Sequence, residues 1–149
     1  MKELIDELNS LIEKSTKTWT SIPKSSWFHK PSSEKWSKGE IAGHLVDSAA
    51  NNIQRFIRAQ YEEAPNLFYN QNEWVRLNHY ETVEKEDLIQ LWALLNRQIS
   101  RIFKNIPPEN LELPCHFKID GQLQIVPLRY VIEDYVAHLK HHLRQITEG

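Results

Sequence analysis

Apolar side chains recur at intervals of three and four residues in four long segments of the chain. That spacing places them on one side of an α-helix and is typical of helices that pack together in a bundle. We expect helices over residues 1–20, 37–61, 83–105 and 127–147. The second helix has a capping-box pattern at its start, because Glu40 follows Ser37 by three residues, and Trp36 can pack on Ile41.

Other local signals separate these helices. Pro65 ends the second helix and Pro107 stops the third. Residues 117–125 alternate between apolar and polar on both sides of Asp120-Gly121, which predicts a tight β-hairpin. The pattern therefore predicts an all-α four-helix bundle with a small β-hairpin before the last helix.

Residues 66–80 form a long connection between the second and third helices. A connection of that length is more often functional than idle. Its aromatic residues include Trp74 and Tyr80, which could cover a cleft in the bundle or simply pack in the core.

Composition narrows the class of protein. The 149 residues fit one domain, residues 1–149, and 40% of them are hydrophobic, which is enough for a core. A net charge of −2 with no basic run argues against nucleic-acid binding. We expect no signal peptide and no membrane segment, because no apolar stretch is long enough. The single cysteine, Cys115, excludes an internal disulfide and suits the cytoplasm.

The last helix carries three of the seven histidines. At about 100° per residue, its apolar arc can be laid out on a helical wheel. The arc consists of Ile132, Val136, Leu139, Leu143 and Ile146, widened by Leu128, Val131 and Tyr135. His142 falls inside the widened arc and His138 lies at its margin, whereas His141 lies almost opposite and should face water. Since His138 and His142 are one turn apart on the same side, they are a candidate pair of metal ligands.

The second helix has a polar strip along one margin of its apolar face. The strip consists of His44, Ser48, Asn51 and Arg55. Asp47 lies in the other direction and is expected to face solvent. Asp134, His138 and His142 form a similar strip on the last helix. Placed face to face, the two strips would line a polar cleft within the bundle.

These strips favour a metal site, although simpler interpretations exist. A lone histidine on a helix margin is usually a hydrogen-bonded surface or core residue, and a pair four residues apart can arise by chance. Ligation by His44, His138 and His142 would leave one coordination position free for water or substrate, as in catalytic metal sites. Neutral imidazoles suit Zn²⁺, Ni²⁺ and other late first-row ions, so the predicted cofactor is a divalent metal, with Zn or Ni foremost.

Three further side chains are candidates for a role in catalysis. Arg55 could clamp a carboxylate or phosphate, or form an ordinary surface ion pair. Asp134 could orient an imidazole, or be an exposed helix carboxylate. Tyr135 could lend its hydroxyl, although core packing is the favoured interpretation.

Other sites are weaker candidates. Cys115 and His116 could be read as a ligand pair or a dyad, but a structural role at a strand entry is the favoured interpretation. His29 and His79 lie in polar segments and are expected to be solvated. The chain contains four glycines and no glycine-rich phosphate loop, G-x-S-x-G elbow or H-E-x-x-H motif.

Two motifs resemble those of the DinB/YfiT-like superfamily of metal-dependent enzymes. The first is Trp36-Ser37-x-x-Glu40-x-x-x-His44-Leu45, and the second is His138-x-x-His141-His142-x-x-Gln145-Ile146. The resemblance extends over essentially the whole chain in the order of elements. It implies a four-helix bundle that often forms a homodimer, with a divalent metal held by His44, His138 and His142. Gln145 stands where some members carry another histidine, which weakens a specific hydrolase assignment.

The resemblance leaves three functions open. Some members are metal-dependent hydrolases, and this is the leading hypothesis, with a small molecule as substrate. Others resemble thiol-dependent S-transferases that use bacillithiol, mycothiol or glutathione, or a maleylpyruvate isomerase, and the same metal site would serve them. The third hypothesis is a non-catalytic bundle that binds a small molecule, with vestigial histidines.

Overall fold

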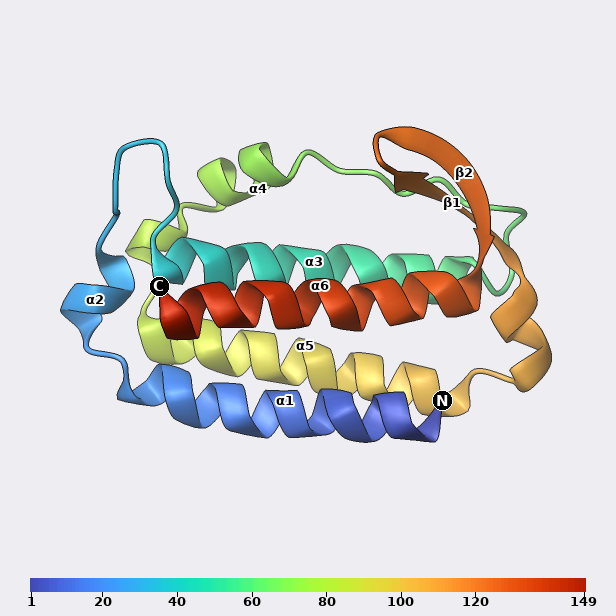
Figure 1. The fold of residues 1–149 in the computed structure, drawn as a ribbon, viewed down its shortest axis with the longest axis horizontal. Helices are drawn as coiled ribbons and strands as arrows, with labels where there is room; N and C mark the ends of the chain where they lie inside the picture. Colours follow the sequence, from blue (N-terminus) through green and yellow to red (C-terminus); the bar gives the residue numbers. More distant parts are fainter.

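The four amphipathic segments form the four long helices of the computed structural model, which describes residues 1–149 (Figure 1). They are α1 (Lys2–Ser21), α3 (Lys38–Arg58), α5 (Lys85–Asn105) and α6 (Leu128–Glu148). At the start of α3, the Glu40 backbone N–H donates to the Ser37 side chain and the Glu40 carboxylate accepts from the Ser37 N–H. The predicted four-helix bundle and its capping box are therefore confirmed.

Four short helical segments lie where loops were expected. They are α2 (Lys24–Phe28), α4 (Gln71–Asn78) and the 3₁₀ segments η1 (Tyr80–Thr82) and η2 (Pro108–Glu112). Segments this short span too few turns to show a repeating apolar pattern. The connection after α3 therefore contains a two-turn helix that the sequence pattern did not indicate.

The predicted hairpin is present and longer than expected. Strands β1 (Pro114–Ile119) and β2 (Gln122–Pro127) pair antiparallel, with Ile119 opposite Gln122. Asp120 and Gly121 both have positive φ, 51° and 78°, as the type I′ turn that joins twisted strands requires. The hairpin lies at the end of the bundle where α6 begins, and it leads directly into that helix (Figure 1).

The helices pack in the order α1, α5, α3, α6 around the bundle. In Figure 1, α3 and α5 run in the same direction, while α1 and α6 run in the opposite direction. Two neighbouring parallel helices cannot be joined by a tight turn, so the chain must return along the length of α3 before α5 begins. The connection that carries α4 makes this return, and it covers the outer side of α3 (Figure 1).

The core is a continuous cluster of 30 buried apolar residues between the four helices. At one end, three tryptophans pack together: the ring centroid of Trp19 lies 5.8 Å from that of Trp27 and 4.5 Å from that of Trp92. All three are fully buried, and Trp27 comes from the short helix α2. None of the helices has both the length and the apolar character needed to cross a bilayer.

A buried lysine joins α5 to the end of α1. Lys85 is 3% exposed, and its ammonium group donates hydrogen bonds to the backbone carbonyls of Trp19, Thr20 and Ile22. Carbonyls in the last turn of a helix lack partners within the helix and lie at the negative end of its dipole. Lys85 therefore caps α1 from a different element.

Asp47 is buried, which contradicts the expectation that it faces solvent. It is 2% exposed, and its Oδ1 accepts hydrogen bonds from the Tyr80 hydroxyl and from Asn78 Nδ2. Helix α4 and η1 cover this side of α3, so the helix has no free face there. Gly43 permits the close approach, because a Cβ at that position would lie 2.2 Å from the Tyr80 ring.

Replacing Asp47 with asparagine is expected to change how stability depends on pH. Burial raises the pKa of Asp47 from 3.8 to about 6, although the Tyr80 hydrogen bond opposes the shift. The folded protein therefore binds this proton more tightly than the unfolded chain, and stability falls as the pH rises between these values. A shift of this size corresponds to about 3 kcal/mol.

The asparagine in Asp47→Asn would keep an acceptor for Tyr80 and would not ionise. The free energy of unfolding of Asp47→Asn, minus that of the wild type, should thus increase from pH 4 to pH 7 when measured by urea denaturation. All other ionisable groups are the same in both proteins, so their contribution cancels in the difference. Parallel stability curves for the two proteins would show that Asp47 is not desolvated in solution.

Candidate metal centre

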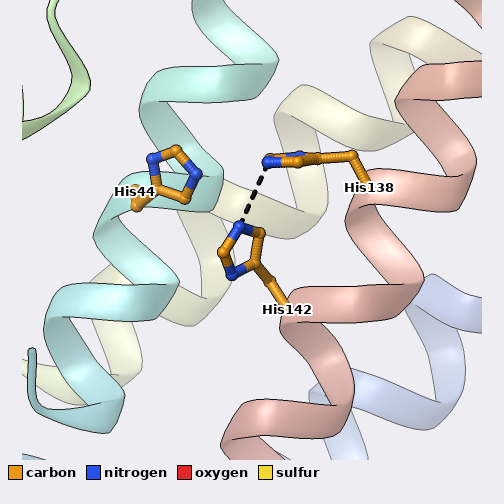
Figure 2. Close-up of side chains that lie close together, drawn as sticks. All are labelled: His44, His138 and His142. Atoms are coloured by element: carbon orange, nitrogen blue, oxygen red, sulfur yellow. Dashed lines mark hydrogen bonds between the residues drawn. The ribbon is translucent and has the colours of Figure 1, made fainter. Parts of the chain in front are cut away.

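Three histidines converge between α3 and α6. The two helices are neighbours of opposite direction, so the beginning of α3 lies beside the end of α6. This brings His44 of α3 opposite His138 and His142 of α6, and the three rings point toward one another (Figure 2). One ring nitrogen from each histidine lies within 4.8 Å of the others.

The two histidines of α6 are the closest pair. Nε2 of His138 and Nε2 of His142 are 3.1 Å apart, and the ring centroids are separated by 4.5 Å (Figure 2). The His44 centroid lies 5.4 Å from that of His138 and 4.8 Å from that of His142. Trp36 lies beside His44 at 5.2 Å between centroids and shields it on one side.

Burial keeps these imidazoles uncharged. His44 is 1% exposed, and its burial, followed by the nearby His142 and His138, lowers its pKa to about 3. Burial is also the main reason that the pKa of His138 falls to about 4, and it lowers the pKa of His142 as well. A neutral imidazole has a free lone pair on one ring nitrogen, and this neutral form of histidine is the one that binds metals.

Gln145 fixes the orientation of one ring. The Oε1 atom of Gln145 lies 2.8 Å from Nδ1 of His142, and an amide oxygen can only accept, so Nδ1 carries the proton. The lone pair of His142 is then on Nε2, which faces His138. His141 is exposed, and its ring lies beside Gln145, with Nε2 3.4 Å from the amide nitrogen. The structure thus separates His141 from the cluster, as the helical wheel predicts.

The cluster has the properties expected of a metal site. Both ring nitrogens of His44 are buried without a hydrogen-bond partner, and such groups are costly unless something satisfies them. Nitrogens at Zn–N distances of about 2.05 Å in a tetrahedral site are about 3.3 Å apart, close to the 3.1 Å between His138 and His142. The residues present therefore fit a divalent ion held by three nitrogens.

A small polar pocket adjoins the cluster. Its volume is about 160 Å³, and His44 and His138 lie on its wall. The rest of the wall comes from α3, α6 and the connection after α3: Ser48, Asn52, Arg55, Tyr69, Gln71, Val131, Asp134 and Tyr135. The predicted polar strips thus do line a cleft, except that His142 is not on its wall and that one asparagine needs correction.

The correction concerns the two neighbouring asparagines of α3. Asn52, not Asn51, lines the pocket, where it donates to the Ser48 carbonyl and accepts from Arg55. Asn51 instead donates to the backbone carbonyl of Asp47. A helical wheel leaves adjacent residues 100° apart, so the choice between them depends on where the neighbouring helix lies.

The structure bears on two of the three candidate helper residues, for each of which a structural alternative was left open. Tyr135 is 4% exposed, and its hydroxyl donates to Asn96 Oδ1 in the core, so that group is not free for a reaction. Asp134 lines the pocket without a hydrogen bond to His138, which argues against its orienting that ring. Burial raises the pKa of Asp134, whereas Arg55 opposes the shift.

The pocket also contains residues that the sequence did not indicate. Tyr69 and Gln71 reach it from the connection after α3, which has no periodic pattern to place them. Of the two aromatic residues suggested as a cover, Trp74 packs against Tyr69 at 5.5 Å between centroids and Tyr80 is bound to Asp47. Neither lines the pocket directly.

The remaining candidates lie outside the cluster. Cys115 is buried and unpaired, and His116 Nδ1 lies 2.6 Å from the Ala64 carbonyl, which agrees with a structural role for both. His29 and His79 are exposed, and His79 lies 3.2 Å from Glu81.

Comparison with known proteins matches this chain to one family. The model of the DinB superfamily matches residues 7–146. "Putative metal-dependent hydrolase YfiT" of Bacillus subtilis (strain 168) is 25% identical over 114 residues, which cover 76% of this chain and 63% of that protein. A relative from Bacillus mycoides (strain KBAB4), also named "Putative metal-dependent hydrolase", is 26% identical over 113 residues, again with 63% of its length matched. The chain thus spans a little under two thirds of the length of these curated relatives.

Solved structures show the same architecture. The structure of YfiT from Bacillus subtilis, described as "a probable metal-dependent hydrolase with an unusual four-helix bundle topology", superimposes with a TM-score of 0.87 at 21% identity. The match covers 99% of this chain and 83% of that one. A mycothiol-dependent maleylpyruvate isomerase shares the fold with a TM-score of 0.76 at 11% identity over 95% of this chain and 58% of its own. The chain therefore belongs to the DinB superfamily.

Proposed function

We propose that this protein is a divalent-metal-dependent hydrolase that acts on a small molecule. The observation that carries the proposal is the convergence of His44, His138 and His142. Both ring nitrogens of His44 are buried there without a hydrogen-bond partner in the protein. A metal ion would bind one of these two nitrogens, the one that carries the lone pair. The names of the two curated relatives support the same reaction class.

The surrounding residues define what each part of the site would do. The three imidazoles would hold the ion, Gln145 would keep the His142 lone pair directed at it, and Trp36 would shield His44 from water. When bound, such an ion polarises a carbonyl or phosphoryl oxygen and acidifies water. His44 and His138 lie on the pocket wall, so a substrate that enters the pocket arrives beside the cluster.

A thiol-dependent S-transferase is the second candidate. A metal ion held by the same three nitrogens would stabilise a thiolate, which is the reactive form of a thiol. The shared fold with a mycothiol-dependent isomerase supports this candidate, and the hydrolase names of the relatives favour the first. A non-catalytic binding bundle is the third.

One assay distinguishes the three. Zinc- and nickel-loaded protein is incubated with esters, amides and phosphoesters, and separately with electrophiles plus low-molecular-weight thiols, next to His138→Ala. We expect hydrolysis that needs no thiol and that disappears in His138→Ala. Turnover only with added thiol would establish the S-transferase, and no turnover by fully loaded protein on either panel would favour the binding bundle.

A further inference from the structure

Arg55 is a cation in the pocket without an anionic partner. It is half-buried on α3, three turns after His44, and its side chain lines the pocket. Its Nη1 donates to Asn52 Oδ1 at 3.0 Å and its Nη2 donates to the Leu67 carbonyl at 2.8 Å. Both acceptors are neutral. Nε is buried without an acceptor, so the guanidinium, which has five N–H groups, is incompletely satisfied.

No carboxylate of the protein forms an ion pair with this guanidinium, although Asp134 is near enough for Arg55 to influence its pKa. Arg55 takes part in no ion pair within 4.0 Å, whereas several other lysines and arginines do: Lys24, Lys30, Arg58, Arg76, Arg129 and Lys140. Asp134 is the one carboxylate on the pocket wall. A buried charge without a partner is costly, which suggests that the partner comes from outside the protein.

The neighbouring contacts hold the guanidinium in place. Asn52, which accepts from Arg55, itself donates to Ser48, so a chain of hydrogen bonds runs along α3 toward His44. The Phe117 ring lies 5.7 Å from the guanidinium carbon and packs against it from β1. These contacts explain the position of Arg55 but not its missing counter-charge.

We propose that Arg55 binds the carboxylate of a small carboxylic-acid substrate whose other end reaches the histidine cluster. Cationic Arg55 lines the same pocket as His44 and His138. Its volume of about 160 Å³ is below the range of roughly 300–1,000 Å³ typical of drug-sized ligands, so the bound group is small.

The charges of the pocket favour a carboxylate over a phosphate. A guanidinium fork matches the planar carboxylate with two parallel hydrogen bonds. A phosphate monoester carries up to two charges and would meet one cation together with the nearby Asp134. A single negative charge therefore suits this wall better.

This inference rests on the proposed function only in that the pocket leads to the metal cluster. The test therefore uses metal-free protein, so that the binding of a carboxylate is measured independently of metal binding. Butyrate and butyramide are the probes, because they have the same shape and differ in charge. Binding is followed by chemical-shift changes in two-dimensional NMR spectra.

We expect wild-type protein to bind butyrate at least about tenfold more tightly than butyramide, since hydrogen bonds to charged groups are the stronger ones. Arg55→Met should abolish the difference. Arg58→Met is the matched control, because Arg58 lies on the same helix and pairs with Glu62 on the outside, and it should behave as the wild type. Equal preference for butyrate in Arg55→Met and in Arg58→Met would overturn the inference.

Two further measurements test the inference without Arg55→Met, in case that variant does not fold. Asp134→Asn removes the neighbouring negative charge and should tighten butyrate binding several-fold, whereas unchanged or weaker binding would contradict the inference. Methyl phosphate should bind wild-type protein less tightly than butyrate, and tighter binding would assign the pocket to phosphates instead. A metal-binding failure would leave all these results unaffected and would count against the proposed hydrolase alone.

Discussion

Replacing Lys85 with methionine is expected to lower the free energy of unfolding by about 3 kcal/mol. Methionine fills similar space but cannot donate to the carbonyls of Trp19, Thr20 and Ile22, which Lys85 now caps. These groups lie under the buried side chain, so water does not readily replace the lost hydrogen bonds. Urea denaturation followed by circular dichroism measures the change.

Lys17→Met is the matched control for this prediction. Lys17 lies on α1, is exposed and makes no hydrogen bond or ion pair through its side chain, so its replacement should change stability by no more than about 0.5 kcal/mol. If Lys85→Met and Lys17→Met both lower the free energy of unfolding by the same small amount, the hydrogen bonds of Lys85 contribute nothing measurable to stability.

Replacing His142 with alanine is expected to weaken metal binding by more than about 100-fold, whereas His141→Ala should bind as the wild type does. Loss of a ligand exceeds the roughly 10- to 100-fold effect of losing a residue that only orients one. His142 Nε2 faces His138 at 3.1 Å, and the exposed His141 lies outside the cluster. Isothermal titration with Zn²⁺ on tag-free protein measures both variants.

His141→Ala serves as the control here because it removes an imidazole from the adjacent position. It also changes the surroundings of Gln145 without removing the Gln145 contact to His142. The reverse outcome, with His141→Ala losing the metal and His142→Ala keeping it, would mean that the helix presents a different face in solution.

The long helices were predictable because each repeats its apolar pattern over many turns. Their directions were not, because periodicity shows which side of a helix is buried and not what covers it. The connection after α3 illustrates this: its length was visible in the sequence, but its path along α3 was not. Asp47 was consequently expected in solvent, whereas α4 and η1 bury it.

The role of Lys85 was also not predictable from the sequence, because it too depends on how the helices pack. A cation in the first turn of a helix opposes the dipole of that helix, so a local rule would count it as unfavourable at the start of α5. Its favourable partners are carbonyls at the end of α1, more than 60 residues away in the sequence. Only the packing of the two helices brings these groups together.

The candidate site was predicted more completely than its pocket. His44, His138 and His142 have regular positions on two helices, so wheels and motifs could select them and separate His141. Tyr69 precedes the short helix α4 and Gln71 begins it, in a connection whose sequence has no periodic pattern. Asn52 takes the place of its neighbour Asn51 through a rotation that the wheel does not resolve. The homodimer, the cytoplasmic location and the choice between zinc and nickel stay predictions.

The most direct test of the central claim is the metal content and coordination of protein purified without a histidine tag. Elemental analysis should give one divalent ion per chain, and X-ray absorption should show three imidazole nitrogens at about 2.0–2.1 Å if the ion is zinc. His138→Ala should contain little metal. Equal, substoichiometric metal in wild type and His138→Ala would contradict the proposal that His44, His138 and His142 form a metal site.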